Sequence, residues 1–202
     1  SLNGAIQPIK GVLAMAIYAK EAGLEGIIVP KINAPEASLI EGIKVYAFEH
    51  LTEVTQFCNH PELFSPYLQN DAESLPTVMG FDVDFTTIKG QFQAKRAIEI
   101  AAAGGHNLIM VGPPGAGKTL LAKTSISILP VMSHSETLET SKVYSLVGKL
   151  SPTAGLMQTR PFRNPHHSLS SIALVGGGSI PQPGEISMAH NGVLFLDELP
   201  EF

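Results

Sequence analysis

The chain has 202 residues, 44% of them hydrophobic and 15% charged, which excludes a peptide hormone and a disordered tail. Its formal charge of −5 arises before Gly80, where there are 4 basic and 9 acidic side chains, because the remainder carries 9 of each. The overall charge therefore does not favour binding to nucleic acid, and contact with DNA or RNA would need local basic patches. The single cysteine, Cys58, excludes an intrachain disulfide, and we expect it to be a small buried hydrophobe.

No run approaches the roughly 20 apolar residues that a membrane span requires, and no signal peptide is visible. The chain begins without methionine and stops two residues after Pro200. It is therefore expected to be a piece of a longer cytosolic protein, with no membrane partner.

Helices and strands alternate in the first part of the chain, which predicts a small α/β layer. The elements are expected over Gly11–Glu21 (helix), Gly26–Pro30 and Val45–Phe48 (strands) and Leu51–Asn59 (helix). Gly23 is suited to end the first helix, and Thr52 is a candidate N-cap of the second. Prolines at positions 61, 66 and 76 then indicate an irregular link. The predicted organisation is a domain over residues 1–60, a link over 61–80 and a domain over 81–202.

The second domain contains a strand, a glycine-rich turn and a helix in succession. A helix over about Gln91–Ala103 precedes the apolar run Leu108–Val111, which is predicted to be a strand, and helical periodicity returns over Thr119–Leu129. Between them, Gly112–Thr119 matches the pattern G-x-x-x-x-G-K-[ST] at every fixed position. This context predicts a loop that binds the phosphates of a nucleotide.

Each fixed residue of that loop serves the chemistry. Glycines let backbone N–H groups converge on phosphate oxygens, and the following helix points its positive end at the same anion. Lys118 is expected to reach the β and γ phosphates as a catalytic residue, and the Thr119 hydroxyl to bind Mg²⁺. The predicted nucleotide-binding residues of this segment are Gly112, Pro113, Pro114, Gly115, Ala116, Gly117, Lys118, Thr119 and Leu120.

A phosphate-binding loop of this kind needs a carboxylate at the end of a neighbouring strand. The apolar run Val193–Leu196 fits a strand buried on both faces of a parallel sheet, and Asp197 and Glu198 follow at its carboxyl end, where such sheets bind ligands. We expect Asp197 to join the magnesium shell and Glu198 to activate the attacking water.

The two motifs together resemble the AAA+ class of ATPases. Three further stretches narrow the resemblance: Arg160–Ser168, the glycines at 176–178, and the run from Pro183 to Phe202. They are similar to the magnesium-chelatase-like AAA+ family of the ComM and YifB type, over nearly the whole chain. The resemblance implies an incomplete P-loop AAA+ αβα core with a parallel sheet, ATP and Mg²⁺ as cofactors, and a homo-hexameric ring that acts on DNA.

The resemblance also assigns further residues. The segment that lies against the adenine in AAA+ proteins corresponds to Ile88, Gly90 and Gln91, and the less favoured alternative for Ile88 is a core position. The long spacing between Lys118 and Asp197 implies an insertion directed toward the ring pore. Four residues of that insertion are candidates for contacts with nucleic acid or a neighbouring subunit: Arg160, Arg163, His166 and His167. The alternative for the two histidines is that they make structural hydrogen bonds.

The first 60 residues resemble the C-terminal part of a Lon-protease-like α/β domain, on the run Ile6–Met15 and its continuation to Pro30. Lon proteases use a Ser-Lys dyad, in which the amine activates the serine. By this resemblance the dyad lysine falls on Met15, whose thioether cannot take a proton, and the serine motif would lie upstream of Ser1. Proteolysis is therefore not expected.

Four functions remain open at this stage. The leading one is an AAA+ ATPase motor for branch migration or helicase-like remodelling of DNA during recombination in natural transformation. The others are a magnesium-chelatase-type ATPase that drives metal insertion, an ATP-dependent protease, and nucleotide binding without turnover. Because the sensor, arginine-finger and lid residues of AAA+ proteins would follow Phe202, the 202 residues alone are expected to bind Mg-ATP with little hydrolysis.

Overall fold

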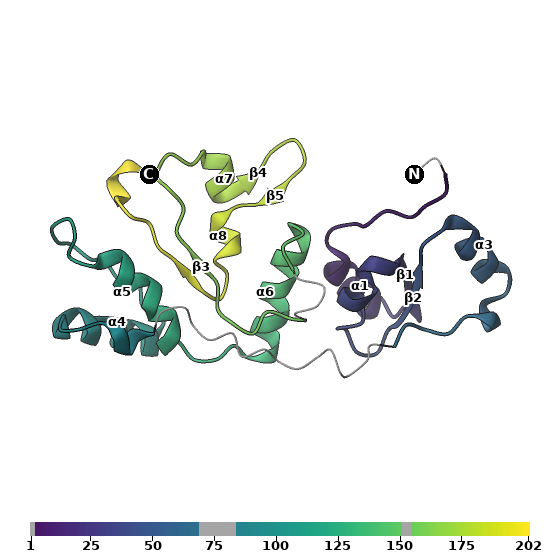
Figure 1. The fold of residues 1–202 in the computed structure, drawn as a ribbon, viewed down its shortest axis with the longest axis horizontal. Helices are drawn as coiled ribbons and strands as arrows, with labels where there is room; N and C mark the ends of the chain where they lie inside the picture. The colour runs from purple at the N-terminus through teal and green to yellow at the C-terminus, as the bar shows by residue number, and fades with distance from the viewer. Residues whose placement is uncertain (1–2, 69–83, 151–154) are drawn as a thin grey trace. The chain divides into compact units, whose positions relative to one another are not determined.

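Helices and short strands alternate through the computed structural model, which describes residues 3–68, 84–150 and 155–202 (Figure 1). The mixed α/β class agrees with the prediction. The chain divides into two units: unit 1 is Ser1–Thr77 with Leu138–Met157, and unit 2 is Val78–Thr137 with Gln158–Phe202. Residues 69–80 of the predicted link lie outside the described residues.

Unit 1 is built on two parallel strands, paired in register from Gly26 with Lys44 to Pro30 with Phe48. Its first elements are α1 (Val12–Glu21), β1 (Gly26–Pro30), α2 (Ala34–Ala37), β2 (Lys44–Phe48) and α3 (Leu51–Asn59). The predicted end of α1 is confirmed: Gly23 has φ 70°, and the N–H groups of Gly23 and Leu24 donate to the carbonyls of Lys20 and Ala19. The buried core comprises Val12, Leu13, Ala16, Val29, Ala34, Ala37, Ile40 and Val45.

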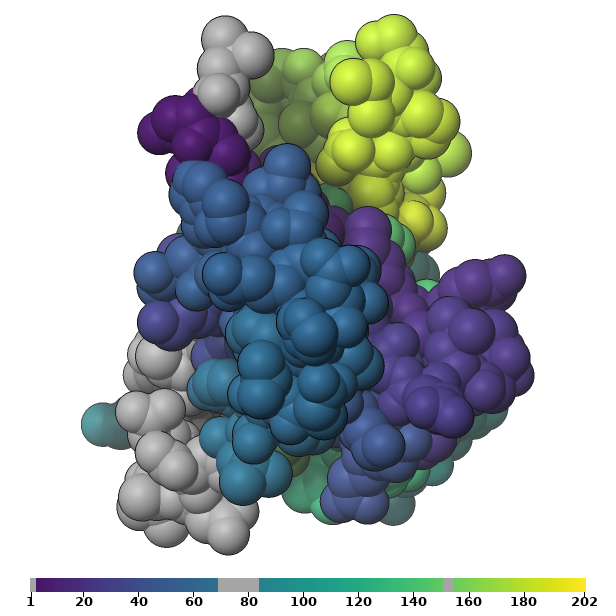
Figure 2. Space-filling view, turned by 90° about the vertical axis from the view of Figure 1, so that its right-hand side faces the viewer, coloured from purple at the N-terminus to yellow at the C-terminus, as the bar shows by residue number. Residues whose placement is uncertain are grey.

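Helix α3 has the predicted bounds, but its N-cap is His50 and not the predicted Thr52. His50 is the N-cap, because its Nδ1 accepts from the Thr52 N–H while the Glu53 carboxylate accepts from the His50 N–H. The expectation of a buried Cys58 is wrong, since this residue is exposed on α3. Helix α3 buries no residue fully and packs through Phe57 against Phe48 and Phe64, so its other face stays in solvent. Figure 2 shows this part of the chain, in blue, at the surface of unit 1.

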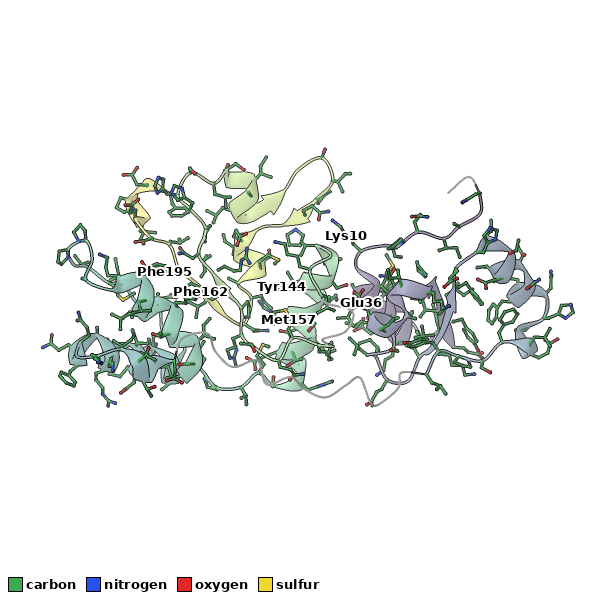
Figure 3. The ribbon with its side chains drawn as sticks, viewed as in Figure 1. Lys10, Glu36, Tyr144, Met157, Phe162 and Phe195 are labelled. Atoms are coloured by element: carbon green, nitrogen blue, oxygen red, sulfur yellow. The ribbon has the colours of Figure 1, made fainter. Side chains whose placement is uncertain are left out.

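A buried carboxylate that sequence reasoning did not find joins two parts of unit 1. Glu36 on α2 is 8% exposed and accepts from the Leu13 N–H (3.2 Å) and from Ser145 Oγ (2.5 Å). Ser145 lies on α6 (His134–Leu146), and its carbonyl accepts from the Gly11 N–H. Glu36 therefore caps the start of α1, whose own N-cap residue Gly11 has no side chain, and holds the end of α6 (Figure 3).

The first α-helix described in unit 2 is the predicted one, α4 (Phe92–Gly104), which packs with α5 (Lys118–Thr124) through Ile98 and Leu121. The predicted helix over Thr119–Leu129 is shorter, because α5 continues only as the 3₁₀ turn η5 (Ser125–Ile128). The remaining elements are η4 (Phe85–Thr87), β3 (Phe162–Arg163), α7 (Ser171–Val175), β4 (Gly176–Gly177), β5 (Gln182–Pro183), α8 (Glu185–Met188), β6 (Val193–Leu194) and η6 (Leu199–Glu201).

Two strand predictions in unit 2 need correction. Leu108–Val111 has no regular secondary structure and pairs with none of the described strands, and its Ile109 and Val111 side chains are exposed. The strand predicted over Val193–Leu196 is limited to β6, which is half-buried rather than buried on both faces. It pairs in parallel with β3, Phe162 opposite Val193, so the predicted parallel arrangement is present at this strand.

Candidate functional site

The predicted phosphate-binding loop precedes α5 directly. Gly115 and Gly117 have φ values of 75° and 85°, a left-handed conformation that residues with a Cβ rarely adopt. Gly117 is the N-cap of α5, and because glycine has no side chain it offers no acceptor to the first N–H groups of the helix. The glycine spacing in the sequence is thus explained by backbone geometry: the loop can turn sharply and present N–H groups to an anion.

Lys118 is folded back over this loop. Its Nζ donates to the carbonyls of Gly112 (3.0 Å) and Pro113 (3.1 Å), which places the ammonium group above the turn. Phosphate oxygens are stronger acceptors for an ammonium group than neutral carbonyls, because both partners are then charged. The position therefore suits an amine that exchanges backbone carbonyls for phosphate.

The two predicted magnesium ligands meet in the fold. Thr119 Oγ1 donates to Asp197 Oδ2 at 3.1 Å, although the residues are 78 positions apart. Mg²⁺ prefers oxygen donors and is commonly held by one or two protein groups together with substrate phosphates. A hydroxyl and a carboxylate at this distance fit such an ion. Among the described residues no cluster of three or more His, Cys, Asp and Glu could hold a metal by itself.

Glu198 follows Asp197 in a conformation uncommon for a residue with a Cβ, at φ 58°. Its carboxylate Oε2 lies 3.0 Å from His167 Nδ1, a contact that the sequence did not indicate. His167 belongs to the turn after β3, and its ring stands 4.1 Å from that of His166, centroid to centroid. His166 Nδ1 contacts Ser168 Oγ at 2.8 Å, so His166 makes a local hydrogen bond.

The predicted adenine segment has two different environments. Ile88 is buried with Phe85, Ile98 and Leu121, and its carbonyl accepts from Lys95 Nζ. Gly90 and Gln91 both have left-handed backbones, at φ 68° and 53°.

The Gln91 side chain reaches the phosphate-binding loop, where its Nε2 donates to the Ala116 carbonyl at 3.3 Å. Leu120, the last residue predicted to bind nucleotide, is half exposed on α5. The structure therefore joins Gln91 to the loop and gives Ile88 a place in the core; their contact with adenine stays a prediction.

The two candidate arginines are engaged within unit 2. Arg160 donates to both carboxylate oxygens of Glu136 (3.0 and 3.2 Å) and to the carbonyls of Pro130 and Asn191 (both 2.7 Å). The N–H of Ser133, and after it the Arg160 guanidinium, hold the pKa of Glu136 below its usual value.

Arg163 on β3 donates through Nε and Nη2 to the two carboxylate oxygens of Glu185, at 2.5 and 2.7 Å. A guanidinium group that bonds both oxygens of a carboxylate fixes the relative position of the two backbone segments that carry them. Both guanidinium groups are bound to carboxylates, so the geometry does not support the candidate nucleic-acid contact at these two positions.

Comparison with known proteins identifies relatives over the whole chain. Residues 84–202 match the family "Magnesium chelatase, subunit ChlI". The competence protein ComM of Haemophilus influenzae is 48% identical over 203 aligned residues, which cover all of this chain and 40% of that protein. The uncharacterized protein YifB of Salmonella typhimurium is 46% identical over 202 residues, again all of this chain and 39% of that protein.

A more distant relative is Lon protease 2 of Bacillus subtilis, 30% identical over 127 residues, which are 58% of this chain and 22% of that protein. No described helix has the length and apolar character needed to span a bilayer. The chain spans about two fifths of the length of its ComM and YifB relatives. On its family match and its similarity along the full chain, it belongs to the magnesium-chelatase-like AAA+ family of the ComM and YifB type.

Proposed function

We propose that this chain is the nucleotide-binding part of an ATP-hydrolysing motor subunit in the cytosol. The observation that carries the proposal is the hydrogen bond between Thr119 and Asp197, because it brings the ends of two motifs far apart in sequence to one point. Membership in the ChlI family supports an ATPase independently of this geometry. In the same proposal, residues 1–60 are the remainder of a Lon-like domain.

The residues divide the work of phosphoryl transfer. The loop N–H groups and Lys118 hold the β and γ phosphates, and Thr119 and Asp197 hold Mg²⁺, which neutralises charge on the phosphate oxygens. Glu198 accepts a proton from the attacking water while the water oxygen bonds to the γ phosphorus. The bond from that phosphorus to the β–γ bridging oxygen breaks, which yields ADP and inorganic phosphate.

The test compares three variants of the full-length gene product in ATP binding and ATP hydrolysis. Lys118→Ala removes the phosphate-binding amine and should abolish ATP binding. Glu198→Gln keeps the shape of the side chain but not the base, so ATP should still bind while kcat falls by about 10²–10⁴-fold. The control is Lys123→Ala, an exposed lysine on the same helix, which should behave as the wild type. Equal loss of ATP binding in the first two variants would contradict the assigned roles.

The oligomeric proposal has its own readout. Members of this family are expected to work as homo-hexameric rings, so Glu198→Gln saturated with ATP should sediment as a hexamer. The 202 residues alone should bind Mg-ATP weakly and turn it over little. Rapid cooperative hydrolysis by these 202 residues would show that no further sensor, finger or lid residues are needed.

The substrate of the motor is proposed to be DNA. The support is the relative named as a competence protein, which shares 48% of its aligned residues with this chain. Forked or four-way junction DNA should stimulate the ATPase of the full-length protein. The alternative is metal insertion into a porphyrin, which the ChlI family match favours. Stimulation by a metal-porphyrin precursor system, with no response to DNA, would select that alternative.

Proteolysis is the least supported activity. The similarity to Lon protease 2 covers 58% of the chain. The position expected for the Lon dyad lysine holds Met15, a half-exposed residue of α1 that cannot act as a base. The full-length protein should therefore degrade no casein in the presence of Mg-ATP.

A further inference from the structure

Lys95 on α4 carries a charge that no carboxylate neutralises. On the same helix Arg96 and Glu99 are exposed and pair with each other at 3.1 Å, whereas Lys95 is half-buried. In the described part of the chain no carboxylate pairs with the Lys95 ammonium group, which donates to the Ile88 carbonyl and lies 5.6 Å from the centre of the Phe85 ring. Burying a charge away from water is costly unless the charge gains partners, so these two contacts decide where the ammonium group lies.

The carbonyl that accepts from Lys95 ends a short segment that is also fixed at its start. The Phe85 N–H donates to Ser127 Oγ at 3.0 Å, and Ser127 lies in η5, directly after α5. Phe85 and Ile88 both belong to the buried cluster between α4 and α5, which lie side by side in Figure 1. The backbone of residues 85–88 is therefore held by both helices, and Lys95 fixes its last carbonyl.

A fixed carbonyl also fixes the direction of the N–H group of the next residue. In a trans peptide group the C=O and N–H bonds point in opposite directions, and the described residues contain no cis peptide bond. Since the Ile88 carbonyl points to the Lys95 ammonium group, the Lys89 N–H points away from it. Lys89 is exposed, and its N–H has no hydrogen-bond partner among the residues that the structure describes. The segment thus presents a free donor in a fixed direction.

This donor belongs to a stretch of chain that is joined to the phosphate-binding loop. Gln91, two residues after Lys89, donates through Nε2 to the Ala116 carbonyl inside the loop at 3.3 Å. When the phosphates of a nucleotide occupy the loop, its nucleoside must lie beside the loop. Purine rings carry nitrogen atoms that accept hydrogen bonds, so an N–H group is a suitable partner for them. A donor that is already fixed binds more tightly than one that must first be ordered.

We propose that Lys95 is a positioning residue for the adenine ring: by holding the Ile88 carbonyl, it directs the Lys89 N–H to a ring nitrogen of the bound nucleotide. The role rests on the proposed ATP binding. Lys95 acts through a peptide group that meets the base, so its effect belongs in affinity. Its loss should raise KM for ATP and Kd for ADP without changing kcat or the hold of the loop on the phosphates.

Matched substitutions in the full-length protein test this role by calorimetric titration with Mg-ADP and with Mg-pyrophosphate, which has no base. Lys95→Met keeps a side chain of similar length without the donor, and Kd for ADP should rise about fivefold to tenfold. Kd for pyrophosphate, and kcat at saturating ATP, should stay within about twofold of the wild type. The control is Arg96→Met, which removes the same charge one position along α4 and should change neither affinity.

The N–H donor can also be removed directly. Lys89→Pro has no backbone N–H, and Ile88, at φ −76° and ψ 119°, has the extended backbone that a following proline requires. Kd for ADP should again rise about fivefold to tenfold, and adding Lys95→Met should cause no further loss, since both changes act on one hydrogen bond. Lys89→Met keeps the N–H and should bind ADP as the wild type does, which controls for the side chain.

Four results would overturn the proposal: an unchanged Kd for ADP in Lys95→Met, the same in Lys89→Pro, an equal rise of Kd for ADP and pyrophosphate, or additive losses in the double variant. The Lys89→Pro variant decides the matter even when Lys95→Met does not fold. Failure of the proposed function is distinguishable, because Lys118→Ala would then bind ATP as the wild type does. A weakened Lys118→Ala beside an unaffected Lys95→Met overturns only the role of Lys95.

Discussion

Removal of the buried carboxylate of Glu36 should strongly destabilise unit 1. In Glu36→Ala the Leu13 N–H and the Ser145 hydroxyl lose their acceptor in a position that water hardly reaches, since Glu36 is 8% exposed and Ser145 is 1% exposed. An unsatisfied buried group costs about 1–3 kcal/mol, so the two together should lower the free energy of unfolding by about 3–4 kcal/mol. The contact from Asn33 Nδ2, at 3.5 Å, adds little at that distance.

Glu36→Gln is the matched variant, because its amide oxygen can still accept from both groups. It loses only the added strength of a charged acceptor, about 1 kcal/mol. For a unit of this size each kcal/mol corresponds to about 4–8 °C in Tm, so the Ala variant should melt about 15–25 °C below the wild type and the Gln variant within about 8 °C of it.

Tyrosine fluorescence during urea unfolding measures this effect in unit 1 alone. The chain has no tryptophan, and all four tyrosines lie within unit 1: Tyr18, Tyr46, Tyr67 and Tyr144. The double variant with Ser145→Ala should be less destabilised than the sum of the single variants, because one alanine removes the cost of the other. A loss below about 1 kcal/mol in Glu36→Ala, or strict additivity with Ser145→Ala, would refute the reasoning.

Three further predictions concern unit 2. Arg160→Lys should lower the Tm of this unit by about 5–10 °C in scanning calorimetry. The reason is that one ammonium group cannot replace a guanidinium group that bonds a carboxylate and two carbonyls. The control, Arg96→Lys on the exposed face of α4, should shift the Tm by less than about 2 °C. The pKa of Glu136 is lowered in the folded state, so the contribution of this carboxylate to stability is complete above the unfolded pKa of 4.5 and is lost as pH falls through the folded pKa. Glu136→Gln should therefore reduce the pH dependence of the urea midpoint of unit 2 below about pH 4.5. Gln91→Leu removes the hydrogen bond to the Ala116 carbonyl and should weaken ADP binding about threefold to tenfold in calorimetric titration, whereas unchanged affinity would mean that Gln91 does not support the loop.

The sequence predicted those parts of the structure that depend on neighbouring residues. Helix α1 follows from apolar spacing and the glycine that ends it, and β1 and β2 follow from short apolar runs. The phosphate-binding loop follows from glycines whose left-handed backbones leave few alternatives. In each case one short stretch of chain contains the whole physical cause.

The features that escaped prediction depend on distant partners. The run Leu108–Val111 has the composition of a strand, but a strand exists only where another pairs with it, and composition does not say which one does. The bond between Ser145 and Glu36 joins residues 109 positions apart. The contact of His167 with Glu198 depends on the register of β3 and β6. The cap at His50 did have a local signal, the glutamate three residues later, but histidine is an unusual residue at that position.

The division of the chain into units also constrains the order in which the protein can fold during synthesis. Each unit is made of two stretches, and the second stretch of unit 1 lies between the two stretches of unit 2. Ser145, which bonds Glu36 of unit 1, leaves the ribosome after the phosphate-binding loop and α5. Unit 1 can therefore be completed only after the phosphate-binding loop has been synthesised. No single cut of the chain can separate one unit from the other, and limited proteolysis in the link between residues 61 and 80 should leave the two pieces dependent on each other.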